Sequence, residues 1–558
     1  MNETSNPLEV GQQYSMELID ITHSGEGVGR LDNMIVFVDG GLPGDVVEVE
    51  IKNVKKTYAQ GKLLSISQAS PVRVTPDCSY FDQCGGCQIR HMSYPGQLKA
   101  KAKMVGDALQ RIGGFKELEV APIIGMEDPL RYRNKAQFKL DRKGMGFYAK
   151  RSHQLVHIDD CLNQPESAAA AIKTINALVQ ELNLSIYDER THKGYLRGVL
   201  QRTNLQGENM ITLIINGKEL SQRQAIIEGI VAGIPNVKSI YANINREKGN
   251  VILGKKSLCV YGAARLVEQI GDLSFSISPN SFFQVNSLQT EKLYDAIKSA
   301  AALTGTETIF DLYCGTGTIG LYLAAQAKQV IGIESVGDAV LDARENAGLN
   351  QIDNARFFLG RAEDEMLKII KDEGVKPDLI VLDPPRKGCD ESLLQAISEL
   401  GTPKLIYVSC NPSTLARDLK FMTEAGYAIK TVQPVDLFPG TGHVETVVLL
   451  SHKKADTHIN VNVEFGEGEG KIPVGKIVEK VEDYRPSEKV TYKMIQEYID
   501  SKYGFKVHTA YIAEVKRDLG LPMHDAPNVV EELKNPRKHP TIEKIEAIKD
   551  ALKYFRVI

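Results

Sequence analysis

Three things are missing from this chain of 558 residues, and each absence excludes a class of protein. No run of about 18 apolar residues occurs, so no helix that spans a bilayer is expected. The first residues, Met1 to Pro7, show no basic run followed by an apolar core, so no secretory signal peptide is expected. No charge of one sign dominates, because 67 Lys and Arg stand against 71 Asp and Glu, and this balance gives no general affinity for nucleic acid. We expect a soluble, cytoplasmic protein of roughly three or four domains.

A cysteine stands where an apolar strand ends and a helix begins. The strand is Leu405 to Ser409, Cys410 follows it, and a helical turn starts near Ser413. Open α/β sheets bind ligands and carry out chemistry at the carboxyl ends of their strands. Free N–H groups at the start of a helix favour a thiolate over a thiol. Cys410 is therefore a candidate nucleophile, although a lone Cys at a strand end is more often a small buried packing residue.

A glycine-rich turn follows an earlier apolar strand, which ends at Asp311. The turn, Gly315-Thr-Gly317-Thr-Ile-Gly320, has the G-x-G-x-x-G spacing, and its glycines let backbone N–H groups approach a ligand. Glu334 ends the next apolar strand, where its carboxylate can bind both hydroxyls of a ribose. That acid suits a nicotinamide cofactor or S-adenosylmethionine. Asp311 and the later Cys and Asp-Pro-Pro motifs have no use in hydride transfer, so S-adenosylmethionine is favoured over the nicotinamide and over a turn without a ligand.

A third motif, Asp383-Pro-Pro-Arg386, closes the apolar strand Asp378 to Leu382. Proline fixes φ, so the turn is stiff and holds the Asp383 carboxylate at the edge of the sheet. A purely structural turn would use the same prolines, and an amino-group methyltransferase would use the same motif without needing a cysteine. Four strands with a functional group at their ends, separated by helical stretches, predict a doubly wound sheet.

Together these motifs resemble the bacterial RNA uracil-5-methyltransferases, and specifically the branch that acts on 23S ribosomal RNA. The resemblance runs from about residue 8 to residue 452 and includes Ser278-Pro-Asn-Ser-Phe-Phe-Gln284 and His443-Val-Glu445-Thr. It implies that Cys410 is the nucleophile and Glu445 the base. The residues that it implies for holding S-adenosylmethionine or the uracil are Gln284, Tyr313, Glu334 and Asp383. Family members usually carry Asn where this chain has Thr318, and without the resemblance Glu445 would pass for a solvated residue at a strand start.

The chemistry explains these residue types. Carbon 5 of uracil is too weak a nucleophile to take a methyl group from a sulfonium, and a thiolate that adds to carbon 6 converts the ring to an enolate in a covalent intermediate. After methyl transfer, the hydrogen on carbon 5 must leave as a proton, which requires a base.

The eight cysteines of a cytoplasmic chain indicate metal binding or catalysis and not disulfides. Cys78, Cys84 and Cys87 lie close together in the sequence, in a glycine-containing loop. Cys161 is the best candidate for a fourth ligand, because the family that this chain resembles places that ligand after the basic segment. Four thiolates suit zinc or an iron–sulfur cluster. The resemblance implies a four-iron four-sulfur cluster. The sequence predicts packing roles for the other three: Cys259, Cys314 and Cys389.

The expected architecture is multidomain α/β. Residues 8–68 alternate short β-like runs with glycine turns such as Gly25 to Gly29, which predicts a small β-barrel. The resemblance implies that this barrel is an OB-like, RNA-binding TRAM domain, and Lys52, Lys55, Lys56 and Lys62 would suit that role. Residues 78–265 are expected to form an α+β central domain with the cluster and with a hairpin of Leu196 to Arg202 and Met210 to Ile215. Residues 266–452 are expected to form a Rossmann-like methyltransferase domain, and 471–558 a small helical extension of unknown role, with a linker or exposed hairpin at 460–475. The helix Gln97 to Ile112 is expected to pack on the methyltransferase domain.

A basic segment, Leu130 to Arg151, holds eight Lys or Arg against one acid, with four interleaved aromatics. That pattern is typical of single-stranded RNA recognition, and a solvated strand face is the alternative. The expected partner is 23S ribosomal RNA, with no membrane and no obligate protein partner. A transfer-RNA enzyme with the same chemistry and a non-catalytic RNA-binding protein on the same fold remain the alternatives.

Overall fold

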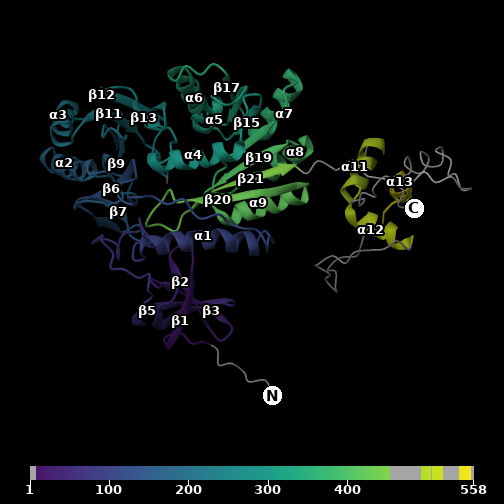
Figure 1. The fold of residues 1–558 in the computed structure, drawn as a ribbon, viewed down its shortest axis with the longest axis horizontal. Helices are drawn as coiled ribbons and strands as arrows, with labels where there is room; N and C mark the ends of the chain where they lie inside the picture. Colours follow the sequence, from purple (N-terminus) through teal and green to yellow (C-terminus); the bar gives the residue numbers. More distant parts are fainter. Residues whose placement is uncertain (1–7, 250, 453–491, 504, 520–539, 555–558) are drawn as a thin grey trace, which may run out of the picture. The chain divides into compact units, whose positions relative to one another are not determined.

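The computed structural model describes residues 8–249, 251–452, 492–503, 505–519 and 540–554. The chain divides into two compact units, Met1–Ala455 and Asp456–Ile558. Within the described residues, no helix is long and apolar enough to cross a membrane. In the large unit a small barrel, a central sheet and a second sheet follow one another along the chain (Figure 1).

The first part of the chain folds into a closed barrel with the strand order β1-β2-β3-β5-β4. Its strands are β1 (Gln13–Ile21), β2 (Glu26–Leu31), β3 (Met34–Asp39), β4 (Val46–Val54) and β5 (Tyr58–Gln68). The predicted barrel is confirmed, but the sequence pattern took the glycines of β2 for a turn, which is wrong. A Cβ on Gly27 would lie 2.7 Å from Leu18 and 2.8 Å from the backbone of Gly41. Glycine is used in β2 because the barrel interior leaves no room for a side chain.

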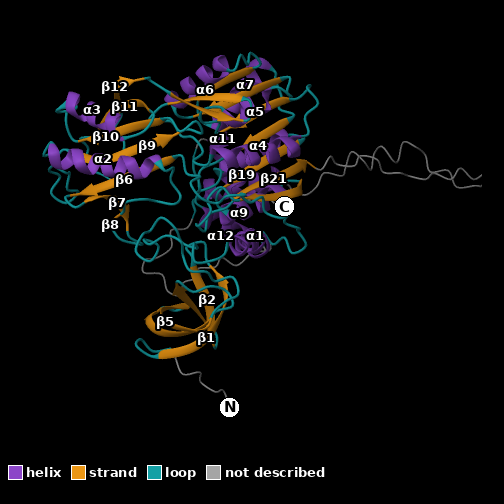
Figure 2. Ribbon diagram, turned by 60° about the vertical axis from the view of Figure 1, so that its left-hand side comes forward, coloured by secondary structure: helices purple, strands orange, loops and turns teal. Residues whose placement is uncertain are grey.

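The central domain is built on a seven-stranded sheet of order β12-β11-β10-β9-β6-β7-β8. The strands are β6 (Lys135–Asp141), β7 (Gly144–Tyr148), β8 (Leu155–His157), β9 (Leu196–Thr203), β10 (Asn209–Ile215), β11 (Val237–Ile244) and β12 (Lys256–Gly262). Helices α2 (Ser167–Glu181) and α3 (Arg223–Gly233) cover one face, as Figure 2 shows. The predicted hairpin of β9 and β10 is confirmed.

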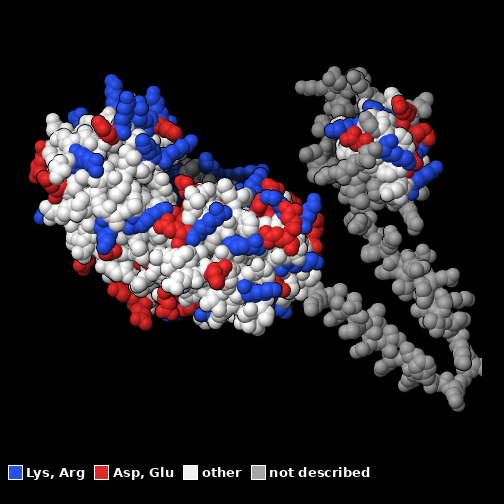
Figure 3. Space-filling view, turned by 90° about the horizontal axis from the view of Figure 1, so that it is seen from above, with Lys and Arg blue, Asp and Glu red and all other residues white. Residues whose placement is uncertain are grey.

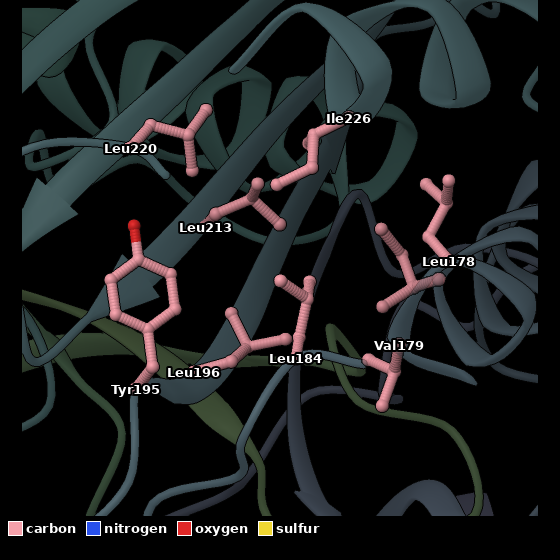
Figure 4. Close-up of a pocket in the computed structure, with 9 residues that line it drawn as sticks. Leu178, Val179, Leu184, Tyr195, Leu196, Leu213, Leu220 and Ile226 are labelled. Carbon is pink, nitrogen blue, oxygen red and sulfur yellow. The ribbon is translucent and has the colours of Figure 1, made fainter. Parts of the chain in front are cut away.

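A small cavity lies in the core between α2, α3 and this sheet. Leu178, Leu213 and Ile226 are among the apolar side chains that line it (Figure 4). Its volume of about 10 Å³ is at the lower limit for a single water molecule. It is therefore a packing gap and not a ligand site.

The basic segment of β6 and β7 differs from its prediction in two ways. Tyr132 and Phe138 are 6% and 0% exposed, so these rings belong to the core and cannot stack on RNA bases. Residues alternate between the core and the surface along β6, and the aromatic rings fall on the core side. Four of the eight basic residues also form ion pairs with acids from other segments: Arg131–Asp160, Lys139–Glu189, Lys150–Asp39 and Arg151–Glu26.

The methyltransferase domain contains a seven-stranded sheet of order β17-β16-β15-β18-β19-β21-β20. Its strands are β15 (Thr308–Leu312), β16 (Gln329–Glu334), β17 (Ala355–Leu359), β18 (Leu379–Leu382), β19 (Lys404–Ser409), β20 (Tyr427–Val435) and β21 (Glu445–His452). The first five strands of this order are parallel to one another, and β21 is antiparallel to both β19 and β20. The strand order reverses between β15 and β18, and ligands bind outside such a switch point. The doubly wound prediction is confirmed.

Helices on both faces of this sheet bury two apolar clusters. These helices are α4 (Ser287–Ala301), α5 (Thr318–Ala324), α6 (Gly337–Leu349), α7 (Ala362–Glu373), α8 (Glu391–Leu400) and α9 (Pro412–Glu424). A short hairpin of β13 (Leu266–Ile270) and β14 (Leu273–Ile277) precedes them.

Helix α1 (Tyr94–Arg111) packs against α9 through Val105 and Leu109, which confirms the prediction that it belongs with the methyltransferase domain. A fully buried ion pair reinforces this contact, because Lys101 Nζ lies 2.6 Å from Asp436 Oδ1. Removing one partner of such a pair leaves an uncompensated buried charge, which costs about 3–5 kcal/mol.

The described residues of the C-terminal unit are mainly helical, as predicted. It contains α11 (Tyr492–Tyr503), α12 (Thr509–Asp518) and α13 (Ile542–Tyr554), which share an apolar core around Ile499, Ile512 and Ile548. The predicted linker or hairpin at 460–475 lies outside the described residues.

Candidate active site

Five acidic or sulfur-bearing side chains lie at the ends of neighbouring strands in the second sheet. Asp311 lies near the end of β15, Glu334 ends β16, Asp383 follows β18 and Cys410 follows β19. Glu445 begins β21, the antiparallel neighbour of β19. Because Ser409 pairs with Thr446, Cys410 and Glu445 are the next residues outward on adjacent strands. The sheet therefore brings together groups that are separated by up to 134 positions in the sequence.

The surroundings of the Cys410 thiol oppose the ionisation that the start of a helix favours. The pKa of the thiol is raised to about 11 by burial and then by the nearby acids Glu445 and Asp383, while Arg386 opposes the rise. The sequence did not reveal these opposing contributions. Asn411 is the N-cap of α9 and its side chain accepts the N–H of Ser413, so part of the free N–H capacity of that helix is already used.

The carboxyl group of Glu445 is buried and not solvated. Its side chain belongs to a residue that is 5% exposed, and its pKa is raised to about 8, first by burial and then by Asp383. Burial also raises the pKa of Asp383 to about 7. Two carboxyl groups that can exchange protons near neutral pH thus lie beside the thiol, which is the arrangement that acid–base catalysis needs.

The glycine-rich turn leaves room for a ligand. Gly315 has a φ of 54°, and a Cβ added to it would meet nothing within 4 Å. At Gly317, with a φ of 82°, an added Cβ would instead lie 2.9 Å from the ring of Phe357. The Gly315 N–H donates to Glu334 Oε2 over 3.1 Å, so the turn and the acid are held as one unit.

Other residues of this region are constrained in ways that the sequence did not reveal. Tyr313 adopts a φ of 67°, which is unusual for a residue other than glycine and often marks a functional site. Asp311 is fully buried and accepts the N–H of Gly320 over 2.8 Å, so it fixes the start of α5. The hydroxyl of Thr318 lies 2.6 Å from that of Tyr294. Gln284 is partly exposed, and its backbone carbonyl accepts a hydrogen bond from Asn134 Nδ2 over 3.0 Å.

Two residues near the thiol were not singled out from the sequence. Arg386 Nη2 lies 3.3 Å from His443 Nε2. Burial and then Arg386 lower the pKa of His443 to about 4, so this ring is neutral at physiological pH. The signal was present, because both residues belong to motifs that carry Asp383 or Glu445.

The segment that leads into Glu445, residues 436–444, is held by several parts of the chain, and we call it the junction loop. The N–H groups of Gln88 and Ile89 both donate to the Gly440 carbonyl over 3.0 Å. Gln97 of α1 accepts the Gly440 N–H, and Tyr132 donates to the Pro439 carbonyl. A Cβ on Gly440 would lie 3.6 Å from Cys87 Sγ. The loop before the base therefore touches the cysteine-containing segment directly.

The four predicted metal ligands are half-buried and lie near one another. Burial, and then Cys87 and Cys78, raise the pKa of Cys84, while burial, Cys87 and Cys84 raise that of Cys161 to about 11. The Asn163 side chain donates to Cys87 Sγ over 3.2 Å, as expected around thiolates. In the described part of the chain, however, no three His, Cys, Asp or Glu side chains are grouped as a metal site.

The remaining cysteines follow their prediction in part. Cys314 and Cys389 are buried in apolar clusters, which confirms their packing role. Cys259 is exposed, so its predicted packing role is wrong. It lies on the edge strand β12, where one side chain in two faces away from the core.

The fold and the strand-end residues define the class, a methyltransferase that uses S-adenosylmethionine. Comparison with known proteins gives the family. The family model described as tRNA (uracil-5-)-methyltransferase matches residues 93–453, and the TRAM domain model matches residues 7–64. This chain belongs to that family and is an S-adenosylmethionine-dependent RNA (uracil-5-)-methyltransferase with a TRAM domain.

Individual relatives agree with this assignment. An uncharacterized RNA methyltransferase of Clostridium tetani is 44% identical over 451 residues, which are 80% of this chain and 98% of the relative. Another, from Halalkalibacterium halodurans, is 45% identical and covers 81% of this chain and 100% of the relative. A crystal structure of the Pyrococcus abyssi tRNA (uracil-54, C5)-methyltransferase with S-adenosyl-L-homocysteine has 28% identity and a TM-score of 0.64, and covers 78% of this chain and 100% of its own. Both family models end before the C-terminal unit.

Proposed function

We propose that Cys410 forms a covalent bond to carbon 6 of the target uracil and that Glu445 removes the proton from carbon 5. The observation that supports this most is the juxtaposition of the two side chains on the paired strands β19 and β21. A buried thiol beside a buried carboxyl group with a pKa of about 8 suits a reaction that moves two protons.

The proposed steps balance as follows. The Cys410 thiol gives its proton to a neighbouring carboxylate, and its sulfur adds to carbon 6 while the ring electrons move to the oxygen on carbon 4. The enolate electrons return through the ring, and carbon 5 takes the methyl group of bound S-adenosylmethionine, which leaves as S-adenosylhomocysteine. Glu445 then takes the carbon 5 proton, and the electrons left on carbon 5 expel the sulfur, which recovers its proton from the carboxyl group that had accepted it. The ring regains its double bond as 5-methyluridine.

The high pKa of the free thiol is compatible with this role. The acids that raise it are also the groups that can accept its proton, because Asp383 and Glu445 have pKa values of about 7 and about 8. Keeping the thiol protonated until the uridine arrives protects it from side reactions, since only the thiolate reacts readily with oxidants.

We further propose that Glu334 binds the ribose of the cofactor, above the open turn at Gly315. Gln284, Tyr313 and Asp383 would complete the pocket for the cofactor and the uracil. The open space over Gly315 and the fixed orientation of Glu334 support this assignment. Thr318 contributes to packing through Tyr294, so we assign it no contact with the cofactor.

For Cys78, Cys84, Cys87 and Cys161 we propose a four-iron four-sulfur cluster with a structural role. The proximity of the thiols and the donor from Asn163 fit four thiolate ligands. The test is metal analysis of anaerobically purified protein, which should be brown and contain about four irons per chain. One zinc and no iron would contradict the cluster.

As substrate we propose one or more uridines of 23S ribosomal RNA, based on the combination of a TRAM barrel with the four cysteines. Transfer RNA is the second candidate. The likeness to the Pyrococcus abyssi tRNA enzyme supports transfer RNA as a substrate. That structure matches 78% of this chain, which is more than the residues 93–453 that the family model matches. Mass mapping of 5-methyluridine in both RNAs from a deletion strain separates the two: the substrate is the RNA that loses its methyl group.

The covalent step is tested with RNA that carries 5-fluorouridine. Fluorine cannot leave as a proton, so methyl transfer should trap the protein and the RNA as an adduct that survives denaturation. Cys410→Ala should give none. Cys259→Ser, which changes an exposed cysteine on β12, is the matched control and should be trapped like wild type. Absence of an adduct with active wild-type protein would contradict the nucleophile assignment.

A further inference from the structure

Three basic side chains of the central domain, Arg133, Lys135 and Arg202, lie together without an acid between them, and we call them the cation triad. Strands β6 and β9 are antiparallel, and Lys135 pairs directly with Arg202 across them. Arg133 precedes Lys135 by two positions and donates to its carbonyl over 3.2 Å. Like charges directly opposite each other in a sheet are destabilising.

The environment of the triad makes this arrangement costlier still. Arg202 is 3% exposed, one of its terminal nitrogens donates to the Ser281 carbonyl, and its Nε has no partner among the described residues. The pKa of Lys135 is lowered to about 7, first by burial and then by Arg202 and Arg133. Asp342 is the acid that acts on Arg202, and it already forms a 2.8 Å ion pair with Arg265.

Other basic residues of the same segment show the contrast. Lys139, four positions along β6 and on the same face as Lys135, lies 2.7 Å from Glu189. Arg131 has Asp160 at 2.7 Å. The basic residues on either side of the triad, Arg131 and Lys139, thus each form an ion pair with a carboxylate. Within the triad, the one acid that acts on Arg202 is Asp342, which is shared with Arg265.

The triad is attached to the segment that carries Gln284. Arg202 bonds to Ser281, and Asn134, between the other two triad residues, donates to the Gln284 carbonyl and to Ser287 Oγ. The Asn134 N–H also donates to the Val285 carbonyl over 2.7 Å. A group bound by the triad would therefore lie beside the segment that we propose to hold the uracil.

We propose that Arg133, Lys135 and Arg202 bind one phosphate group of the RNA backbone next to the target uridine. Arg202 is buried, Arg133 and Lys135 are partly exposed, and cations in such surroundings are stabilised when an anion arrives. Guanidinium groups also match the geometry of phosphate oxygens. A nucleotide turned out of its stack needs its backbone held in the new orientation, and a phosphate clamp beside the base pocket does so. This inference rests on the proposed uridine site, because the triad is placed beside Gln284.

The test compares Lys135→Met with Lys139→Met as a matched control on the same strand and face. Affinity for a short labelled oligouridylate is measured over a range of salt concentrations, in a Cys410→Ala background so that no turnover occurs. Lys135→Met should weaken binding about tenfold at low salt and reduce the slope of log affinity against log salt by about 0.7, the value for one phosphate contact on a single strand. Lys139→Met should leave the slope unchanged.

Thermal unfolding without RNA provides a second readout. Lys135→Met should raise the melting temperature, because it removes like-charge repulsion. If Lys135 instead had a merely structural role, the substitution would lower the melting temperature. An unchanged salt slope would overturn the proposal. Weaker binding of S-adenosylmethionine with an unchanged slope would also overturn it and would indicate the cofactor's carboxylate as the anion. The proposed chemistry fails separately, by loss of the 5-fluorouridine adduct in wild type.

Discussion

The lone thiol of Cys410 and the four thiols of the central domain lie in different surroundings. Burial and two neighbouring acids, Glu445 and Asp383, raise the pKa of the lone thiol of Cys410. The thiols of Cys78, Cys84, Cys87 and Cys161 are instead close enough for some of them to raise the pKa of others, and Cys87 accepts a hydrogen bond from Asn163. A single thiol beside carboxyl groups can lose its proton on demand, whereas four adjacent thiols repel one another as thiolates unless a metal compensates them. This difference supports the two roles that we propose, a reactive sulfur at Cys410 and structural ones in the group of four.

The largest effect is expected at the lone thiol. Cys410→Ala should lower methyl transfer on the order of 10⁴-fold or more, because no other group can add to carbon 6. Binding of S-adenosylmethionine should stay within about twofold of wild type, since Cys410 lies outside the glycine-rich turn. Transfer of a labelled methyl group and calorimetric cofactor binding measure the two effects. Substantial residual methyl transfer by Cys410→Ala would contradict the role of Cys410 as the nucleophile, and with it the proposed difference from the other four thiols.

Removing the acid beside Cys410 should have the next largest effect. Glu445→Gln should slow turnover on the order of 10²- to 10⁴-fold, the usual worth of a general base. The block should fall after methyl transfer, so a methylated protein–RNA adduct should accumulate and survive denaturation. Gel analysis with a labelled cofactor detects it. Fast release of normal product would argue against Glu445 as the base.

A smaller effect is expected from the group of four. Cys84→Ser should remove the brown colour and the iron, and should weaken RNA binding by about tenfold, which corresponds to about 1.4 kcal/mol. Cofactor binding should hardly change, because the cofactor turn lies in another sheet. Cys259→Ser is the control for loss of a thiol. If the bleached variant bound RNA as well as wild type, the four cysteines would have no role in forming the RNA surface.

The last effect concerns the pH dependence of stability and not activity or RNA binding. The folded pKa of Glu445 is raised from 4.5 to about 8, so between these values the folded protein binds more protons than the unfolded chain. Stability should therefore fall as pH rises through this window, by up to about 1.4 kcal/mol per pH unit for one group. Glu445→Gln should make the melting temperature less dependent on pH between 5 and 8 than in the exposed control Glu117→Gln. An equally steep dependence in both would contradict the burial of a protonated Glu445.

Strand-end chemistry was predictable from the sequence because it is local. A run of apolar residues that ends in Asp383 or Cys410 defines both the strand and its functional group, and parallel strands bring their ends to one edge. Electrostatics was not predictable, because the proton on Cys410 depends on Glu445, which is 35 positions away and arrives through an antiparallel strand. The barrel strand with Gly27 was missed for a related reason, since its need for glycine comes from Leu18 on another strand.

The basic segment shows the same limit. Counting charges between Leu130 and Arg151 indicated RNA binding along the whole stretch, but four of its cations are paired with acids from distant segments. Figure 3 shows one face of the large unit, on which Lys and Arg gather along one margin and are interspersed with acids elsewhere. Only the folded chain tells which cations remain without a partner.

The junction loop has a consequence for the order in which the protein becomes competent. Residues 436–444 are held by Gln88 and Ile89 from the cysteine-containing segment, by Gln97 of α1 and by Tyr132 of the central domain. Cys410 and the cofactor turn need none of these contacts, since both belong to the parallel core of the second sheet. The position of Glu445 therefore depends on contacts from the N-terminal parts of the chain. Under the proposed mechanism, a molecule without these contacts would carry a nucleophile but could not release its product, and it would remain attached to the first RNA that it modified.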